Sequence, residues 1–105
     1  MTERQRLPNR RYCTTQQLHH HGTSYDLTIG VYADGQPGEV FIDGAKVGST
    51  MSYLVHDVAV LISIAMQHHV PLQVMADAVA RVGAHGEAHS IAGAVLDLLT
   101  EESPR

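Results

Sequence analysis

The residues best suited to bind a ligand stand at the expected start of a long helix. The segment Gly48-Ser49-Thr50-Met51-Ser52 places hydroxyl groups where a helix offers free backbone N–H groups and a partial positive charge, and Lys46 lies just before it. This combination can hold an anion such as a phosphate group, although helix capping uses the same residue types. The candidate contacts for an anion or nucleotide are Lys46, Gly48, Ser49, Thr50 and Ser52.

Histidine is the second residue type that could do chemistry, because the chain has eight of them. His19 and His21 would share one face of a β-strand, and two imidazoles at that spacing can bind a transition metal. Isolated surface histidines give the same spacing without binding anything, and a single cysteine leaves no structural zinc pattern. His19 and His21 are the candidate metal ligands, and a small histidine-based metalloprotein or enzyme is the alternative function.

Covalent and acid–base catalysis receive little support from the sequence. Cys13 lies in a polar segment with no base or oxyanion loop at a fixed spacing. Glu39, Asp57 and Asp77 form no recognisable carboxylate pair, and the GxxxxGK[ST] phosphate loop of nucleoside triphosphatases is absent. We therefore assign no catalytic residue and no cofactor, and we expect no enzymatic activity from this chain alone.

Composition indicates one small folded domain. The chain has 105 residues, of which 44% are hydrophobic and 17% charged. The net charge is −4 and the arginines gather near the N-terminus, so we expect no general nucleic-acid surface. One cysteine cannot form an internal disulfide and no signal peptide is visible, so we expect a cytoplasmic protein.

Alternating hydrophobic residues predict three strands in the first half of the chain. Tyr25, Leu27 and Ile29 fall on one strand face, and Asp34-Gly35 with Pro37-Gly38 is typical of a hairpin turn. Short turns between consecutive strands predict an antiparallel meander. The expected strands are Arg10–His20, Ser24–Ala33 and Glu39–Asp43.

Three helices are predicted for the second half. The longest has apolar residues spaced three and four apart, and Val60 and Ile64 are apolar as well, so we expect it to be buried on more than one side. Polar residues such as His56 and Asp57 interrupt its apolar run, which argues against a membrane span. The expected helices are Thr50–His69, Leu72–Val82 closed by Gly83, and Ser90–Glu102, with a loop at Ala84–Glu87.

The order of these elements predicts an α+β fold. It is a three-stranded antiparallel meander followed by three helices packed on one sheet face, β-β-β-α-α-α. We divide the chain into a flexible N-terminal arm at 1–9, a single domain at 10–102 and a tail at 103–105.

Three segments match the pattern of a known family: residues 6–11 (RLPNRR), 25–52 and 58–75. They include the elements Gly38–Ile42, Gly48-Ser49, Ile62–Gln67 and Val70–Leu72. These segments resemble the C-terminal region of adenosylcobalamin-dependent ribonucleotide reductases, which is related to the TSCPD domain. That domain also occurs in small free-standing proteins, and the final helix suits such members.

The chain departs from the family at the residues that perform redox chemistry. The Thr-Ser-Cys-Pro-Asp motif is absent, and so is a Cys-x-x-Cys tail. A reductase barrel cannot fit in 105 residues, so a label of ribonucleoside-diphosphate reductase would name a relative rather than an activity. The resemblance implies a non-catalytic binding or accessory module in DNA biosynthesis, whose partner is a ribonucleotide reductase, a nucleotide or a second copy of the chain.

A surplus of apolar residues predicts a homodimer. Three helices can cover only one sheet face, and strand alternation cannot direct Tyr12, Tyr25, Tyr32 and Phe41 into one core. A small domain gains buried area by pairing, and a twofold dimer is the commonest arrangement. We expect no membrane contact.

Overall fold

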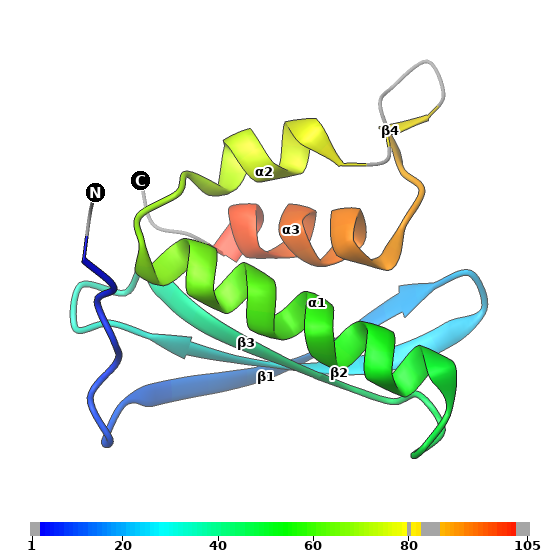
Figure 1. Cartoon of the computed structure of the whole chain (residues 1–105), viewed down its shortest axis with the longest axis horizontal. Coiled ribbons are helices and arrows are strands. Elements are labelled where there is room, and N and C mark those ends of the chain that lie inside the picture. The colour runs from blue at the N-terminus through cyan, green and yellow to red at the C-terminus, as the bar shows by residue number, and fades with distance from the viewer. Residues whose placement is uncertain (1–2, 80, 83–86, 103–105) are drawn as a thin grey trace.

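A three-stranded antiparallel sheet carries two helices on one of its faces, and a third helix packs on one of these two (Figure 1). The computed structural model describes residues 3–79, 81–82 and 87–102. The strand order is β1-β2-β3, and a two-stranded hairpin lies between the second and third helices. The elements are β1 (Tyr12–His20), β2 (Thr23–Val31), β3 (Pro37–Asp43), α1 (Thr50–Gln67), α2 (Leu72–Ala78), β4 (Arg81–Val82), β5 (Glu87–Ala88) and α3 (Ile91–Glu102).

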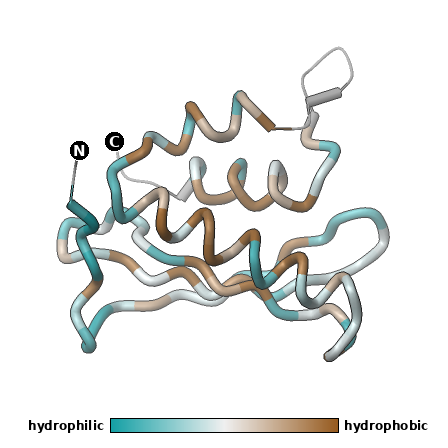
Figure 2. Tube along the Cα trace, viewed as in Figure 1, coloured by the Kyte–Doolittle hydropathy of each residue, from teal (hydrophilic) through white to brown (hydrophobic). Residues whose placement is uncertain are grey.

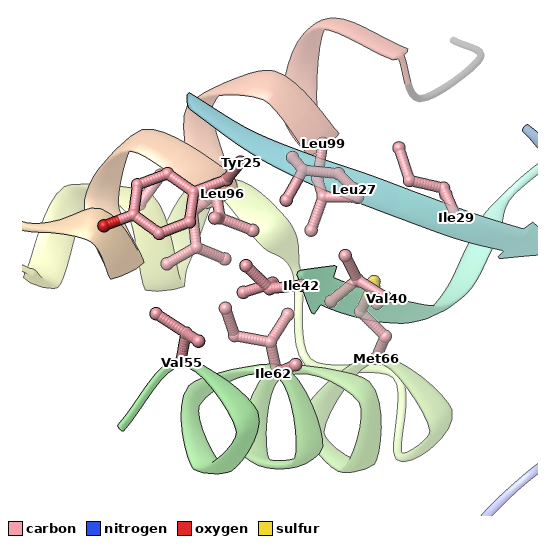
Figure 3. Close-up of a cluster of buried hydrophobic side chains, with 13 residues drawn as sticks. Tyr25, Leu27, Ile29, Val40, Ile42, Val55, Ile62, Met66, Leu96 and Leu99 are labelled. Atoms are coloured by element: carbon pink, nitrogen blue, oxygen red, sulfur yellow. The ribbon is translucent and has the colours of Figure 1, made fainter. Parts of the chain in front are cut away.

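The register of the sheet confirms the predicted meander. Leu27 of β2 pairs with Ile42 of β3, and Ile29 pairs with Val40, so alternate side chains point toward the helices. Those residues are buried, whereas Phe41 points to the opposite face and is half exposed. The side chains labelled in Figure 3 converge from β2, β3, α1 and α3 into one core.

Helix α1 packs along β3, but it is buried on one side only. Val55, Ala59, Ile62 and Met66 face the core, while Leu54 and Leu61 are 54% and 66% exposed. The expectation of burial on more than one side is therefore wrong. The cause is the placement of α2 and α3, which lie along one flank of α1 and leave its outward side open (Figure 1). Figure 2 shows hydrophobic residues recurring along α1.

Helix α1 also meets the length and hydropathy of a membrane span, with a mean hydropathy of 1.3 over its 18 residues. Its side chains instead pack against β3 and bond to the strand backbone. That packing identifies α1 as the core helix of an α+β domain.

The second predicted helix is too long. Helix α2 ends at Ala78, because Val79 has an extended backbone with φ −101° and ψ 138°, and Arg81–Val82 form a strand paired with Glu87–Ala88. The predicted cap at Gly83 and most of the predicted loop at 84–87 lie outside the described residues. Helix α2 packs on α3 rather than on the sheet (Figure 1).

Helix α3 begins one residue later than predicted, at Ile91. The Ser90 hydroxyl accepts a hydrogen bond from the Gly93 N–H at 3.1 Å, which is the geometry of a helix N-cap. Val95, Leu96 and Leu99 on this helix are buried and complete the core.

Candidate functional site

The predicted ligand residues lie together at the start of α1, where two of their hydroxyls are engaged in capping. Ser49 is the N-cap: its Oγ accepts a hydrogen bond from the Ser52 N–H at 3.1 Å and donates to the Lys46 carbonyl. The Ser52 hydroxyl donates to the Ser49 carbonyl at 2.7 Å. The Ser49 N–H donates to the Lys46 carbonyl, so the groups left for a ligand are the Thr50 and Met51 amides, which have no acceptor among the described residues, and the exposed Lys46 side chain.

Backbone conformation accounts for Gly48 at this position. Its φ is +81°, in the left-handed region that glycine adopts without strain, and a Cβ placed there would meet nothing within 4 Å. Gly48 and Ser52 line a shallow groove of about 580 Å³ that is also lined by Asp43 and Tyr53. An anion at this helix start would therefore sit near one fixed negative charge as well as the helix dipole.

The two predicted metal ligands have different partners. His19 lies on the outer sheet face, and its Nδ1 is 2.7 Å from the Ser24 hydroxyl. His21 lies beyond the end of β1 in a turn with φ +49°, and its Nε2 is 3.1 Å from the His89 carbonyl. Within the described ranges, no three His, Cys, Asp or Glu side chains are grouped to hold a metal ion.

The β1–β2 turn instead brings together three imidazole rings. The His21 ring is 4.1 Å from that of His20 and 5.8 Å from that of His89, both edge to face. Partial burial lowers the pKa of His20, and the neighbouring His21 lowers it further. The local spacing of the histidines does not indicate that His89 lies beside this turn, because the two segments are brought together by the packing of the chain before α3.

Two polar residues of α1, Ser63 and Gln67, cover the free edge of β3. In the sequence they interrupt an otherwise apolar run. The Ser63 hydroxyl accepts a hydrogen bond from the Val40 N–H at 2.9 Å, and the Gln67 side chain donates to the Gly38 carbonyl at 2.9 Å. Both bonds replace partners that a further strand would supply. Their spacing of four residues, on one helix face, was the signal that could have identified them.

A groove of about 500 Å³ runs between β3 and α1 beside these contacts. We call it the β3 groove; among its lining residues are Phe41, Ile42, His56, Val60 and Ile64. Strand alternation directs the N–H and C=O of Ile42 toward the same edge as those of Val40. The β3 groove thus combines backbone hydrogen-bonding groups with exposed apolar side chains.

The N-terminal segment closes one end of the β3 groove. The Arg4 guanidinium donates to the buried Gln67 side chain at 2.6 Å, and the Gln5 N–H donates to the Gln67 carbonyl at 2.7 Å. Tyr32 donates its hydroxyl to the Gln5 carbonyl. Residues 3–9 form no helix or strand, and the flexibility predicted for this arm stays a prediction.

On the outer sheet face, Arg11 and Glu39 form an ion pair above Gly30. Arg11 Nη2 is 3.0 Å from Glu39 Oε1, and Nε bonds the other carboxylate oxygen. The pKa of Arg11 is raised, chiefly because its guanidinium donates a hydrogen bond to Glu39. A Cβ on Gly30 would lie 2.8 Å from Glu39 Cγ, so the missing side chain makes room for the buried carboxylate.

A second apolar surface lies on the other flank of α1. We call it the outer stripe; it consists of Met51, Leu54, Val58, Leu61 and Ala65. Val58 and Leu61 also line a shallow groove of about 310 Å³, whose other walls include Met75 of α2, Val79 just after α2 and Ala92 of α3. None of the described residues that line this groove is charged.

Comparison with known proteins identifies the family. The TSCPD domain family matches residues 2–103. Vitamin B12-dependent ribonucleotide reductases are similar: the protein from Rhodopirellula baltica is 43% identical over 72 residues, which is 69% of this chain and 7% of that enzyme. The Bradyrhizobium diazoefficiens protein is 37% identical over 74% of this chain and 6% of the enzyme. This chain therefore corresponds to a small part of each relative, and no solved structure gives a significant match.

Proposed function

Since this chain belongs to the TSCPD domain family, we propose that it is a non-catalytic accessory module that binds a vitamin B12-dependent ribonucleotide reductase. The similarity to a small part of such reductases supports a role beside their catalytic machinery. Cys13, the one cysteine, is exposed on the outer sheet face and has no base beside it among its described contacts. We place the module in the cytoplasm and in DNA biosynthesis, alongside the reductase.

The observation that carries this proposal is the β3 groove. Val40 and Gly38 are already bonded to α1, whereas Ile42 directs its backbone groups into a groove with exposed Phe41 and Val60 on its walls. A free strand edge flanked by apolar pockets suits an extended peptide, which adds backbone hydrogen bonds and inserts alternate side chains. We propose that an extended segment of the reductase binds there.

A nucleotide or other anion at Lys46, Gly48, Ser49, Thr50 and Ser52 is a second part of the proposal. Its support is the set of free amides in the first helical turn together with the Lys46 charge. Such a contact would allow the module to sense a phosphate group without carrying out chemistry on it.

Binding of the purified chain to an immobilised vitamin B12-dependent ribonucleotide reductase tests the main proposal. We expect saturable binding that Phe41→Ser or Val60→Ser weakens at least tenfold, since each change removes an apolar contact of the β3 groove. Leu61→Ser is the matched control, because Leu61 is equally apolar and lies on the other flank of α1. Absence of binding, or equal weakening by all three changes, would reject the β3 groove as the contact.

A further inference from the structure

We infer that two copies of this chain pair through their α1 helices, antiparallel, along the outer stripe. The inference does not depend on the reductase contact, because the outer stripe and the β3 groove lie on opposite flanks of α1. It specifies the surface for the homodimer that the composition predicts.

The outer stripe has the periodicity of a helix-packing surface. Its residues are spaced three, four, three and four positions apart, which is the pattern of a helix-packing seam. A parallel stripe of the same spacing, Val55, Ala59, Ile62 and Met66, is the one that packs into the core. Helix α1 thus has two seams, and the protein's own core covers only one of them.

The outer stripe is largely exposed to solvent. Leu61 is 66% exposed, Leu54 54% and Met51 38%, while Val58 and Ala65 are partly buried. Val58 and Leu61 join the stripe to the apolar walls contributed by α2 and α3, and no charged residue is among the described residues that line this groove. Such patches on small proteins mark interaction sites.

The order of residues along the outer stripe suits a second copy of the same stripe. A twofold axis beside Val58 places Leu54 opposite Leu61 of the partner subunit. Leu54 lies four residues before Val58 and Leu61 three residues after it, so the two are at similar distances from the axis. It places Met51 opposite Ala65 of the partner subunit, so a long side chain meets a short one. The stripe is therefore complementary to itself in both size and polarity, and a partner with charges in its seam would leave them buried and unpaired.

The size and charge of this surface determine the strength of the dimer. The stripe with Met75, Ala78, Val79 and Ala92 provides nine residues a side, against roughly 20–30 in a stable interface. The dimer should therefore dissociate on dilution. Asp57 lies exposed beside the stripe, and the twofold brings the two copies of Asp57 onto the same rim, so added salt should strengthen pairing by screening their repulsion.

Sedimentation velocity over roughly 5 µM to 1 mM chain, a range that spans weak association, tests the inference. We expect the apparent mass to rise from that of the 11.4 kDa monomer toward twice that value as the concentration increases. In high salt, this rise should occur at a lower protein concentration. Leu61→Glu should leave only monomer, because it buries a charge in the seam. Val60→Glu, which introduces the same charge on the opposite flank, is the matched control and should still dimerise. Circular dichroism establishes that both variants are folded.

Disulfide trapping tests the direction of the helices. In a Cys13→Ser background, Val58→Cys should form a covalent dimer on mild oxidation, because the axis brings the two copies of this position together. A mixture of Leu54→Cys and Leu61→Cys chains should form a mixed dimer more readily than either chain alone. Monomer at every concentration, or equal loss of the dimer in Leu61→Glu and Val60→Glu, would overturn the inference. Self-linking of Leu61→Cys in preference to the mixed dimer would overturn the antiparallel arrangement.

Discussion

The Ser63 hydroxyl on α1 accepts a hydrogen bond from the Val40 N–H on β3 at 2.9 Å, so a helix side chain takes the place of a neighbouring strand. Ser63 donates to the Ala59 carbonyl at 2.8 Å and lies 3.3 Å from the Val40 carbonyl. With Gln67 bonded to Gly38, α1 covers the first half of an edge that would otherwise pair with other chains. The second half, at Ile42, borders the β3 groove.

Ser63→Ala should lower the free energy of unfolding by about 1–3 kcal/mol, because it leaves the Val40 N–H without its partner in a partly buried site. Thr100→Val is the control, since Thr100 also donates to a carbonyl four residues earlier but has no described bond to the sheet. Urea unfolding of the two variants gives the comparison. Equal losses would show that the bond to β3 contributes nothing.

Gly30→Ala should destabilise the fold by about 1–3 kcal/mol through overpacking, because the new methyl group meets the Glu39 side chain held by Arg11. The Glu39→Ala change removes that obstacle. In the double variant the cost of Gly30→Ala should therefore be markedly smaller than in the wild-type background. Additive losses in a thermal-unfolding cycle would show that the close approach of Gly30 to Glu39 is not what requires glycine.

Thermal stability should fall as the pH drops below neutrality, in part through His20. Burial lowers its folded pKa below the ordinary 6.5, so the unfolded chain takes up the proton more readily. The contribution of His20 is fully present above pH 6.5 and is lost as the pH falls toward its lower folded pKa. Protonation also places charge beside the rings of His21 and His89.

Melting temperatures measured between about pH 7.5 and 5.5, which spans the histidine range, check this prediction. His20→Gln should reduce the decline. His19→Gln, a neighbouring change on the exposed outer face, should leave the decline as it is in the wild type. A decline that His20→Gln does not alter would assign the pH dependence to other groups.

Titration with ADP followed by NMR should shift the amide signals of Gly48, Ser49 and Thr50 before any others. The physical reason is that the dipole of α1 and the amides of Thr50 and Met51, which are not used in capping, lie at this position. Lys46→Ala should weaken the response and Lys46→Arg should retain it, since only the first removes the charge. Shifts confined to the histidines of the β1–β2 turn would move the proposed anion contact away from the helix start.

Strand structure could be predicted from the sequence because burial there follows residue type with a period of two. Leu27, Ile29, Val40 and Ile42 all face the core as their alternation indicates. The buried face of α1 could not be predicted in the same way. Each of its two apolar stripes consists of larger apolar residues and one alanine, so only the packing of α1 along β3 shows that the stripe with Ala59 is the buried one.

The end of α2 and the cover of the β3 edge depend on contacts between distant residues. Arg81–Val82 form a strand because they pair with Glu87–Ala88, although their local sequence continues a helical pattern. Ser63 and Gln67 are polar residues four apart on a largely apolar helix, which the sequence shows plainly. Their partners, Val40 and Gly38, could be identified only after α1 had been placed on β3.

Hydrogen–deuterium exchange of this chain with and without saturating vitamin B12-dependent ribonucleotide reductase tests the proposed function most directly. We predict slower exchange in β3 around Ile42 and in the part of α1 that lines the β3 groove, and no change in α2. Unchanged exchange throughout the chain, at reductase concentrations that saturate any binding, would contradict the assignment of this module as a reductase-binding partner.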